Sequence, residues 1–447
     1  MNFKIRLPLL RCAVLCCASS LSFPTMASDD AMMDLLKVLR DKGTISEQDY
    51  QALQNAAQEE TAAAATKQSP GLVLDTGSSG LKLKSADGAF KFQVGGRVMV
   101  DAAYYDEDKT DLGSGAEIRR ARLFAAGTVY DDWFYKAQVD FAGNAVSLKD
   151  FYMGYQGFDL VKVTIGNQKE PFSLEELTSS KYITFMERGL PNAFSPSRNT
   201  GISLSTNADK WGLHAGYFYD GVKNDNSPER DGWGATGRVH FAPLSGDGSV
   251  VHLGGSASYR GGGGSDVIRY RERPESHVTS TRLVDTGDVS GYDNQTLLGA
   301  EAAAVFGPFS LQGEYMQTDV DTSGGGSDPK FNGWYAFGSW FLTGEHRPYK
   351  GSNGTFGRVK PKSIVGQGGH GAWELAARYS SLDLDDSGVN GGKQDDYTLG
   401  VNWYATPNIR FMANYIHVKT TPTSEVKYPD AGDEKDNIFQ MRAQVDF

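Results

Sequence analysis

The last nine residues of the chain, 439–447, read FQMRAQVDF and alternate strictly between apolar and polar side chains. Successive side chains of a β-strand point to opposite faces of the sheet, so Phe439, Met441, Val445 and Phe447 share one face. The intervening side chains, which include Arg442, form the opposite, polar face. The stretch therefore predicts a β-strand with one apolar and one charged face.

The same alternation recurs along most of the chain, for example in RVMVDAAY (97–104), WFYKAQVDF (133–141) and NIRFMANYIHV (408–418). Sixteen such segments can be counted between residues 89 and 447. A soluble sandwich would also alternate, but segments of about ten residues with aromatic ends are typical of a transmembrane barrel. We therefore predict an all-β fold, a 16-stranded antiparallel transmembrane β-barrel.

The connections between these segments mostly alternate between tight turns and long loops, as expected for the two ends of such a barrel. One connection, 344–370, falls on the short-turn side although it is long. Two explanations remain open. Either the count is wrong by one hairpin at this point, or a long periplasmic turn folds back into the barrel.

The N-terminus, residues 1–27, has basic residues around a short apolar run and a small-x-small end, which predicts a signal peptide. All three cysteines lie in this segment, so the mature chain would contain neither disulfides nor a thiolate site. Without the segment the chain keeps 41 basic and 55 acidic residues. This acidic balance argues against a nucleic-acid partner.

Residues 28–58 differ from the rest and predict a small periplasmic helical hairpin, in which Gly43 ends the first helix and Ser46 with Asp49 caps the second. Residues 59–80 are predicted to be a linker, and residues 81–447 the barrel. The role of the hairpin is left open between trimer assembly and a periplasmic contact.

A second motif, IRYRERPES (268–276), places Arg269, Arg271 and Arg273 at every second position of an acidic chain. In an extended strand these side chains share one face, where they repel one another unless an anion is present. The simpler interpretation is a solvated loop in which Glu272 and Glu275 neutralise the arginines.

Further motifs occur in a fixed order: EIRRARLFAAG (117–127), LKDFYMGY (148–155), IGNQKEPFSLEE (165–176), RLVDTGD (282–288), GAWELAARYS (371–380) and a C-terminal Phe447. With the arginine motif, they resemble the phosphate-selective porins O and P, a family of the Gram-negative outer membrane, over about residues 80–447. The resemblance implies a homotrimer of sixteen-stranded barrels in outer-membrane lipid, each with its own pore. It also implies that segments 168–200, 261–294 and 344–370 fold inward.

The resemblance further implies a row of arginines that leads anions to a constriction. By motif, the row corresponds to Arg269, Arg271 and Arg273. The constriction corresponds to Arg97, Arg119 and Arg120 with the acidic partner Asp150. Lys169 and Arg282 are additional candidates for lining the pore, although Glu170 lies beside Lys169.

Two details of the second strand remain open in the sequence. Strict alternation lets only one of Arg119 and Arg120 face inward unless a β-bulge lies there. Arg122 either lines the pore or neutralises Glu117. Arg97 has a comparable alternative, as a lumen charge paired with Asp101.

The predicted function is passive conduction of anions, phosphate or polyphosphate, through an arginine-lined pore in the outer membrane. The alternative is a general or differently selective diffusion porin on the same scaffold. The sequence shows neither a Ser/His/Asp constellation nor a H-E-x-x-H motif, so we predict neither an enzyme nor a metal or cofactor site.

Overall fold

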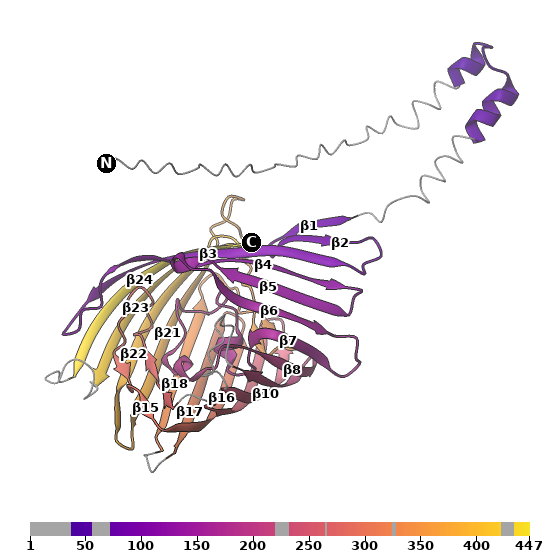
Figure 1. Cartoon of the computed structure of the whole chain (residues 1–447). Coiled ribbons are helices and arrows are strands. Elements are labelled where there is room, and N and C mark those ends of the chain that lie inside the picture. The colour runs from indigo at the N-terminus through magenta and orange to yellow at the C-terminus, as the bar shows by residue number, and fades with distance from the viewer. Residues whose placement is uncertain (1–36, 56–71, 220–231, 264–265, 324–327, 422–432) are drawn as a thin grey trace, which may run out of the picture. The chain divides into compact units, whose positions relative to one another are not determined.

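The computed structural model describes residues 37–55, 72–219, 232–263, 266–323, 328–421 and 433–447 (Figure 1). The chain divides into two units, Met1–Gly71 and Leu72–Phe447. The predicted signal peptide, 1–27, and part of the predicted linker lie outside the described residues.

The first unit contains two short helices, described over residues 37–41 and 47–55. The backbone N–H of Asp49 donates to Ser46 Oγ at 3.1 Å, and the Ser46 N–H donates to Asp49 Oδ2 at 3.2 Å. This is the predicted reciprocal cap of the second helix. Tyr50 is buried beneath the Arg40 guanidinium, which lies 4.7 Å from the centroid of its ring.

The second unit is an antiparallel barrel of sixteen strands, and Figure 1 shows them side by side around the lumen. The strands are β3 (Lys91–Asp106), β4 (Gly115–Val129), β5 (Trp133–Asp140), β6 (Ser147–Tyr155), β7 (Lys162–Lys169), β8 (Arg198–Ala208), β9 (Trp211–Tyr219), β10 (Trp233–Gly246), β11 (Ser249–Gly261), β16 (Tyr292–Phe306), β17 (Phe309–Thr322), β18 (Lys330–Phe341), β21 (Ala372–Asp386), β22 (Val389–Tyr404), β23 (Ile409–Thr421) and β24 (Glu434–Asp446). The last strand pairs with the first, from Asp446↔Arg97 to Asn437↔Asp106, so the sheet closes. Closure leaves no free edge in the lipid.

A short hairpin precedes the barrel, formed by β1 (Val73–Gly77) and β2 (Gly80–Lys84), and β2 pairs with β3. The end of the predicted linker, 59–80, is therefore a strand and not an irregular connection. The reason is local: apolar Leu74 and Leu81 flank a polar turn, so the segment can pair with itself and extend β3.

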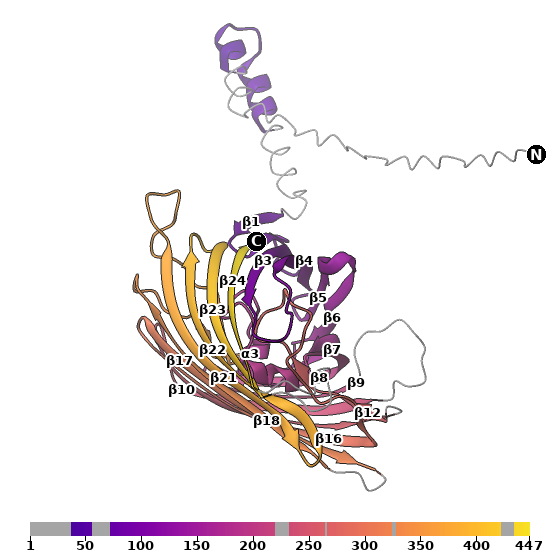
Figure 2. The same ribbon diagram turned by 90° about the vertical axis from the view of Figure 1, so that its left-hand side faces the viewer.

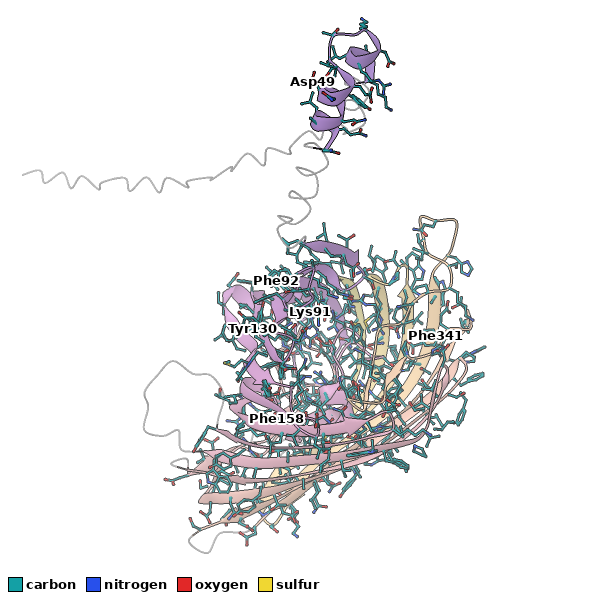
Figure 3. All side chains as sticks on the ribbon, turned by 90° about the vertical axis from the view of Figure 1, so that its right-hand side faces the viewer. Asp49, Lys91, Phe92, Tyr130, Phe158 and Phe341 are labelled. Atoms are coloured by element: carbon teal, nitrogen blue, oxygen red, sulfur yellow. The ribbon has the colours of Figure 1, made fainter. Side chains whose placement is uncertain are left out.

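The two faces of each strand differ as predicted. On the outer face of β24, Phe439 and Met441 are 47% and 50% exposed. Arg442 lies on the inner face of the same strand and is 2% exposed. Phe92, Tyr130 and Phe158 also belong to the exposed apolar surface (Figure 3). The polar face is buried because segments of the chain fill the lumen. Among the described residues, no helix has the length and apolarity needed to cross a membrane.

Two connections at the long-loop end fold into the barrel and carry short elements, and the view in Figure 2 shows α3 inside the ring of strands. The connection between β7 and β8 contains α3 (Leu174–Leu177) and the 3-10 helix η2 (Leu190–Phe194), and another 3-10 helix, η1 (Ala142–Asn144), follows β5. The connection between β11 and β16 contains two small ladders, β12 (Val267–Ile268) with β15 (Val289–Ser290) and β13 (Arg271–Glu272) with β14 (Val284–Asp285).

The long connection at the short-turn end, 342–371, also folds inward and contains β19 (Tyr349–Lys350) and β20 (Thr355–Phe356). Its Gly354 carbonyl accepts a hydrogen bond from Arg238 Nη2 at 2.8 Å, and Arg347 Nη2 donates to Gln312 Oε1 at 2.9 Å. Arg238 on β10 and Gln312 on β17 therefore both face the lumen. The strand count of sixteen therefore stands, and the second explanation for this connection, a turn folded into the barrel, is correct.

Candidate pore constriction

The connection between β7 and β8 crosses the lumen because polar side chains of the opposite wall satisfy its backbone. Arg410 Nη1 donates to the Ile183 carbonyl at 2.7 Å, and Ser380 Oγ accepts from the Leu190 N–H at 2.8 Å. On another strand, Glu314 Oε2 accepts from the Leu174 N–H at 2.9 Å. These contacts fix the segment across the bore.

The connection between β11 and β16 is fixed in the same way. Gln440 Nε2 donates to the Glu275 carbonyl at 3.0 Å, and Glu275 forms an ion pair with Arg378. The hydroxyls of Tyr105 and Ser276 lie 2.7 Å apart. Tyr270 packs in an apolar cluster with residues of both inward segments and of the barrel wall. All three segments predicted to fold inward do so.

Between the β7–β8 segment and the wall of β3 to β7 lies a cavity of about 530 Å³. Its basic side chains are Arg97, Arg119, Arg120, Arg122, Lys136, Lys149, Lys162, Lys169, Arg188 and Arg198. Only Asp150 and Glu176 contribute carboxylates to its lining. The structure thus brings together five of the residues predicted from the sequence, namely Arg97, Arg119, Arg120, Asp150 and Lys169.

Two β-bulges raise the number of charged side chains that face this cavity. On β4, Met99 pairs with Arg120 and Val100 with Ile118, so Arg119 is the extra residue. The bulge that the sequence required is therefore present, and both arginines line the cavity. On β6, a register shift between Ala137 and Val139 of its partner strand brings Lys149 and Asp150 into the same lining.

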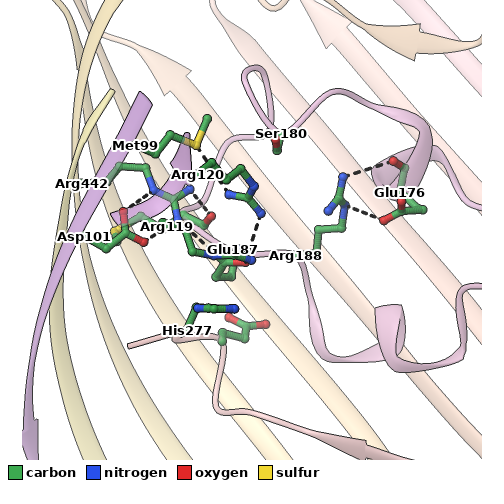
Figure 4. Close-up of polar contacts among 12 residues, drawn as sticks. Met99, Asp101, Arg119, Arg120, Glu176, Ser180, Glu187, Arg188, His277 and Arg442 are labelled. Atoms are coloured by element: carbon green, nitrogen blue, oxygen red, sulfur yellow. Dashed lines mark hydrogen bonds and ion pairs between the residues drawn. The ribbon is translucent and has the colours of Figure 1, made fainter. Parts of the chain in front are cut away.

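A loop carboxylate, Glu187, meets three of the arginines (Figure 4). Arg119 reaches it through two hydrogen bonds of 2.8 and 2.9 Å, Arg442 Nη2 at 2.7 Å, and Arg120 Nη2 at 3.7 Å. Burial alone would raise the pKa of Glu187, but Arg119, Arg120 and Arg442 hold the pKa well below its usual range. Glu187 is therefore ionised at neutral pH.

The remaining ion pairs distinguish the cavity's cations from one another. Arg122 Nε lies 2.7 Å from Asp140, and Arg198 Nε lies 2.7 Å from Asp150. Arg97 bonds to Ser180 Oγ at 2.6 Å and forms no ion pair with any carboxylate that the structure describes. The sequence left open whether Arg122 lines the pore or neutralises Glu117. It lines the cavity, and Glu117 pairs instead with His277 at 2.8 Å. Asp101 pairs with Arg442, not with Arg97.

The arginine motif 268–276 lies in the β11–β16 segment. Arg269 pairs with Asp285 at 2.5 Å and lies 3.7 Å from Asp288, so neither Glu272 nor Glu275 neutralises it. Arg271 is exposed. Arg273 lines a smaller cavity of about 200 Å³, which shares Arg119 and Arg188 with the larger one.

Arg282 lies near the inner end of this motif. Its pKa is lowered by burial and then by the neighbouring charges of Arg273 and Arg271. Tyr270, which lies between Arg269 and Arg271 in the chain, is buried in the apolar cluster. Arg269 and Arg271 are exposed, and of the three arginines Arg273 lines the smaller cavity.

Sequence reasoning missed several residues of the site. Lys136 lies on the polar face already assigned to its strand, so its inward position could have been found. Lys149 and Arg198 could not, because the position of Lys149 depends on a bulge and Arg198 belongs to none of the motifs that resemble the family. Glu187 carries no local signal either.

A closed sixteen-stranded barrel with a lipid-compatible outer surface and a charged, constricted lumen is an outer-membrane porin. The model for the family described as phosphate-selective porin O and P matches residues 92–447, and the chain belongs to this family. It is therefore a channel and not an enzyme, and its location is the outer membrane of Gram-negative bacteria.

Individual proteins and solved structures are also similar to this chain. An uncharacterized protein of Caulobacter vibrioides is 35% identical over 379 residues, which cover 81% of this chain and 75% of the relative. Porin O of Pseudomonas aeruginosa is 29% identical over 395 residues, covering 79% and 89%. Among solved structures, the anion-selective porin of Comamonas acidovorans superposes with a TM-score of 0.52 at 17% identity, covering 80% of this chain and all of that one. OmpT of Vibrio cholerae gives 0.52 at 15%, covering 80% and 98%. The last two likenesses concern the fold.

Proposed function

We propose that the pore conducts small oxyanions, phosphate or polyphosphate, through the cavity between the β7–β8 segment and the wall of β3 to β7. The observation that carries the proposal is its charge: ten basic side chains line a space of about 530 Å³. The carboxylates that oppose them are Asp150 and Glu176 in the lining, with Asp140 and Glu187 paired to Arg122 and Arg119. Ions respond to the local potential in a narrow bore, so the acidic composition of the whole chain does not oppose anion entry.

Hydrogen-bonding capacity supports the same proposal. The Nε atoms of Arg120 and Arg273 are buried donors without a hydrogen-bond partner among the described residues. Leaving such a donor unpaired is costly, and a tetrahedral oxyanion offers acceptors in the geometry that a guanidinium prefers. Arg97, which lacks a carboxylate partner, would supply a further free positive charge.

Release is as necessary as binding. Asp150 lies between Lys136 and Arg198, at 2.5 and 2.7 Å, and lowers the net positive charge at one side of the cavity. Glu187 does the same for Arg119 and Arg120. We infer that these carboxylates keep anions from remaining bound, because conduction requires weak, successive sites.

The approach from outside would use the arginine motif. Arg269, Arg271 and Arg273, with Arg282 beside them, would pass anions from the exposed loop to the smaller cavity and then to Arg119. Lys169 would contribute at the larger cavity, although its ammonium already lies 3.1 Å from Glu176.

The preferred anion is part of the proposal, as is the oligomeric state. The family's description and the Porin O relative support a phosphate-like substrate. A trimer form of OmpT among the similar structures supports a homotrimer. The alternative, a general diffusion porin, predicts similar passage of anions and cations. Migration of the unheated protein in detergent gels would test the trimer independently of conduction.

The decisive experiment is the zero-current potential of single pores in a potassium chloride gradient, followed by titration of phosphate against the chloride current. We expect anion preference and block by phosphate at concentrations well below that of chloride. The double variant Arg119→Ala/Arg120→Ala should lose both, whereas Lys330→Ala, which removes an exposed cation paired with Asp319, should keep both. Unchanged preference in the double variant would refute the proposal.

A further inference from the structure

Three histidines lie next to one another on the inner wall of the barrel, one on each of the neighbouring strands β9, β10 and β11. The ring centroids of His214 and His240 are 5.9 Å apart, and those of His240 and His252 are also 5.9 Å apart. The strand partner of His240 on β9 is Gly212, which has no side chain to fill the space between the rings.

The three rings differ in their hydrogen bonds. His252 uses both nitrogens, with Tyr349 Oη at 2.6 Å and Glu301 Oε1 at 2.9 Å. Nε2 of His214 and Nδ1 of His240 are buried and have no hydrogen-bond partner among the described residues. A buried imidazole nitrogen without a hydrogen-bond partner costs free energy, and a bound ligand would remove that cost at these two atoms.

Both unpaired nitrogens border the same small space. A Cβ atom placed on Gly212 would lie 2.4 Å from Cε1 of the His240 ring, which packs over the glycine, and 3.1 Å from both His214 Nε2 and His240 Nδ1. The two nitrogens are therefore no more than about 6 Å apart. Two ligands of a tetrahedral ion with bonds of about 2.0–2.1 Å are separated by roughly 3.4 Å, which falls within this limit.

The protonation of His240 is fixed by the inward turn. Its Nε2 lies 2.8 Å from the Gly351 carbonyl oxygen, which can only accept, so Nε2 carries the proton. In the neutral ring the lone pair is then on Nδ1, the atom that faces the space above Gly212. A second ring nitrogen that donates to a backbone carbonyl is the usual arrangement of a histidine that binds a metal.

We propose that His214 and His240 bind a first-row transition-metal ion such as Zn²⁺ or Cu²⁺. Imidazole suits these ions, and water or an anion from the lumen would complete the coordination. Among the described residues, no group of three or more His, Cys, Asp or Glu side chains is placed to hold a metal ion, so the proposed site would have two protein ligands. The proposal is independent of which anion the pore conducts.

The nearby charge of Arg238 does not prevent cation binding, because Glu301 neutralises it. Arg238 Nε lies 2.9 Å from Glu301 Oε1, and both side chains are buried. The bound ion would also stabilise the inward turn, since His240 holds Gly351, and Arg238 holds the carbonyls of Asn353 and Gly354. The metal would thus link β9 and β10 to the segment that narrows the periplasmic mouth.

The test uses the mature full-length protein in detergent, without a histidine tag, and equilibrium dialysis against Zn²⁺. We expect one ion per barrel at micromolar concentration. His214→Gln and His240→Gln should each weaken binding at least tenfold. His214→Gln keeps the bond between His240 and Gly351. The control His370→Gln removes an exposed histidine near the end of the inward turn and should bind as the native protein does.

A Cu²⁺ spectrum provides a second readout, because two coordinated imidazoles give nitrogen couplings that each single variant should reduce to one. Heat-modifiable migration in gels would show that the variants form barrels. Absence of a bound ion in the native protein, or equal binding in His214→Gln and the native protein, would overturn the proposal. An intact nitrogen pattern in His240→Gln would do the same.

Discussion

Glu187 and Arg119 form a two-pronged ion pair, with Nε–Oε1 and Nη2–Oε2 distances of 2.8 and 2.9 Å, although 68 positions separate them in the chain. The carboxylate comes from the inward segment and the guanidinium from the bulge of β4. The pair therefore connects the element that narrows the pore to the wall that carries its cations, and it partly neutralises them.

Removing this carboxylate should strengthen anion binding. In Glu187→Gln the charges of Arg119, Arg120 and Arg442 lose a shared partner, and a charge-assisted contact of this kind is worth about 1.5–3 kcal/mol. We expect phosphate to block the chloride current at roughly tenfold lower concentration and the single-channel current in phosphate to fall. Asp319→Asn, which breaks an exposed pair with Lys330, is the control. Weaker phosphate block would contradict the role given to Glu187.

Arg97 and Arg122 are cross-strand partners that differ in pairing, and they make a matched comparison. Arg122 is neutralised by Asp140 at 2.7 Å, whereas Arg97 donates to the hydroxyls of Ser179 and Ser180 and pairs with no carboxylate in the described part of the chain. Replacing a free charge near the anion path should cost about 1 kcal/mol after screening, a several-fold loss of anion preference.

We therefore expect Arg97→Gln to shift the zero-current potential toward zero more than Arg122→Gln does. The two variants should be measured in the same salt gradient, because screening affects both equally. A larger shift in Arg122→Gln would show that pairing does not decide which cation attracts anions.

Deleting Arg119 tests the bulge itself. Every other pair between β3 and β4 can keep its register when the extra residue is removed, so the barrel should still fold and migrate as a heat-modifiable species. Anion preference should fall about as far as in Arg119→Gln. If the deletion abolishes folding while Arg119→Gln does not, the bulge is needed for the wall and not only for the charge.

The anion route should also depend on pH. Burial raises the pKa of Glu272 to about 7, partly opposed by its hydrogen bond from the Arg273 N–H. Because a raised carboxyl pKa favours the neutral form, Glu272 is uncharged below about pH 7 and negative above it. The added negative charge beside Arg273 should lower anion preference as the pH rises from 6 to 8. Zero-current potentials at these two values should differ in the native protein and agree in Glu272→Gln; an equal pH effect in the variant would exclude Glu272 as its origin.

Much of the fold was predictable because side chains of a strand alternate between the two faces of the sheet. In this barrel one face contacts lipid and the other contacts the polar lumen, so the same alternation recurs in all sixteen strands. Family motifs also identified Arg97, Arg119, Arg120 and Asp150, which the structure places around one cavity. The prediction of a linker over residues 59–80 was only partly right, since β1 begins within this range at Val73.

The sequence by itself determined the strand pattern and which face of each strand is apolar, and it predicted part of the cavity lining, including Arg97, Arg119 and Arg120. Only the tertiary structure decided which cations are neutralised, because Glu187 and Asp140 reach Arg119 and Arg122 across loops and strands without any local pattern. It also decided that Arg119 and Arg120 both face inward and that His214 and His240 share one space. A bulge interrupts the alternation at a single residue, and contacts across the lumen join segments that are distant in the chain, so the period of two does not fix either of them.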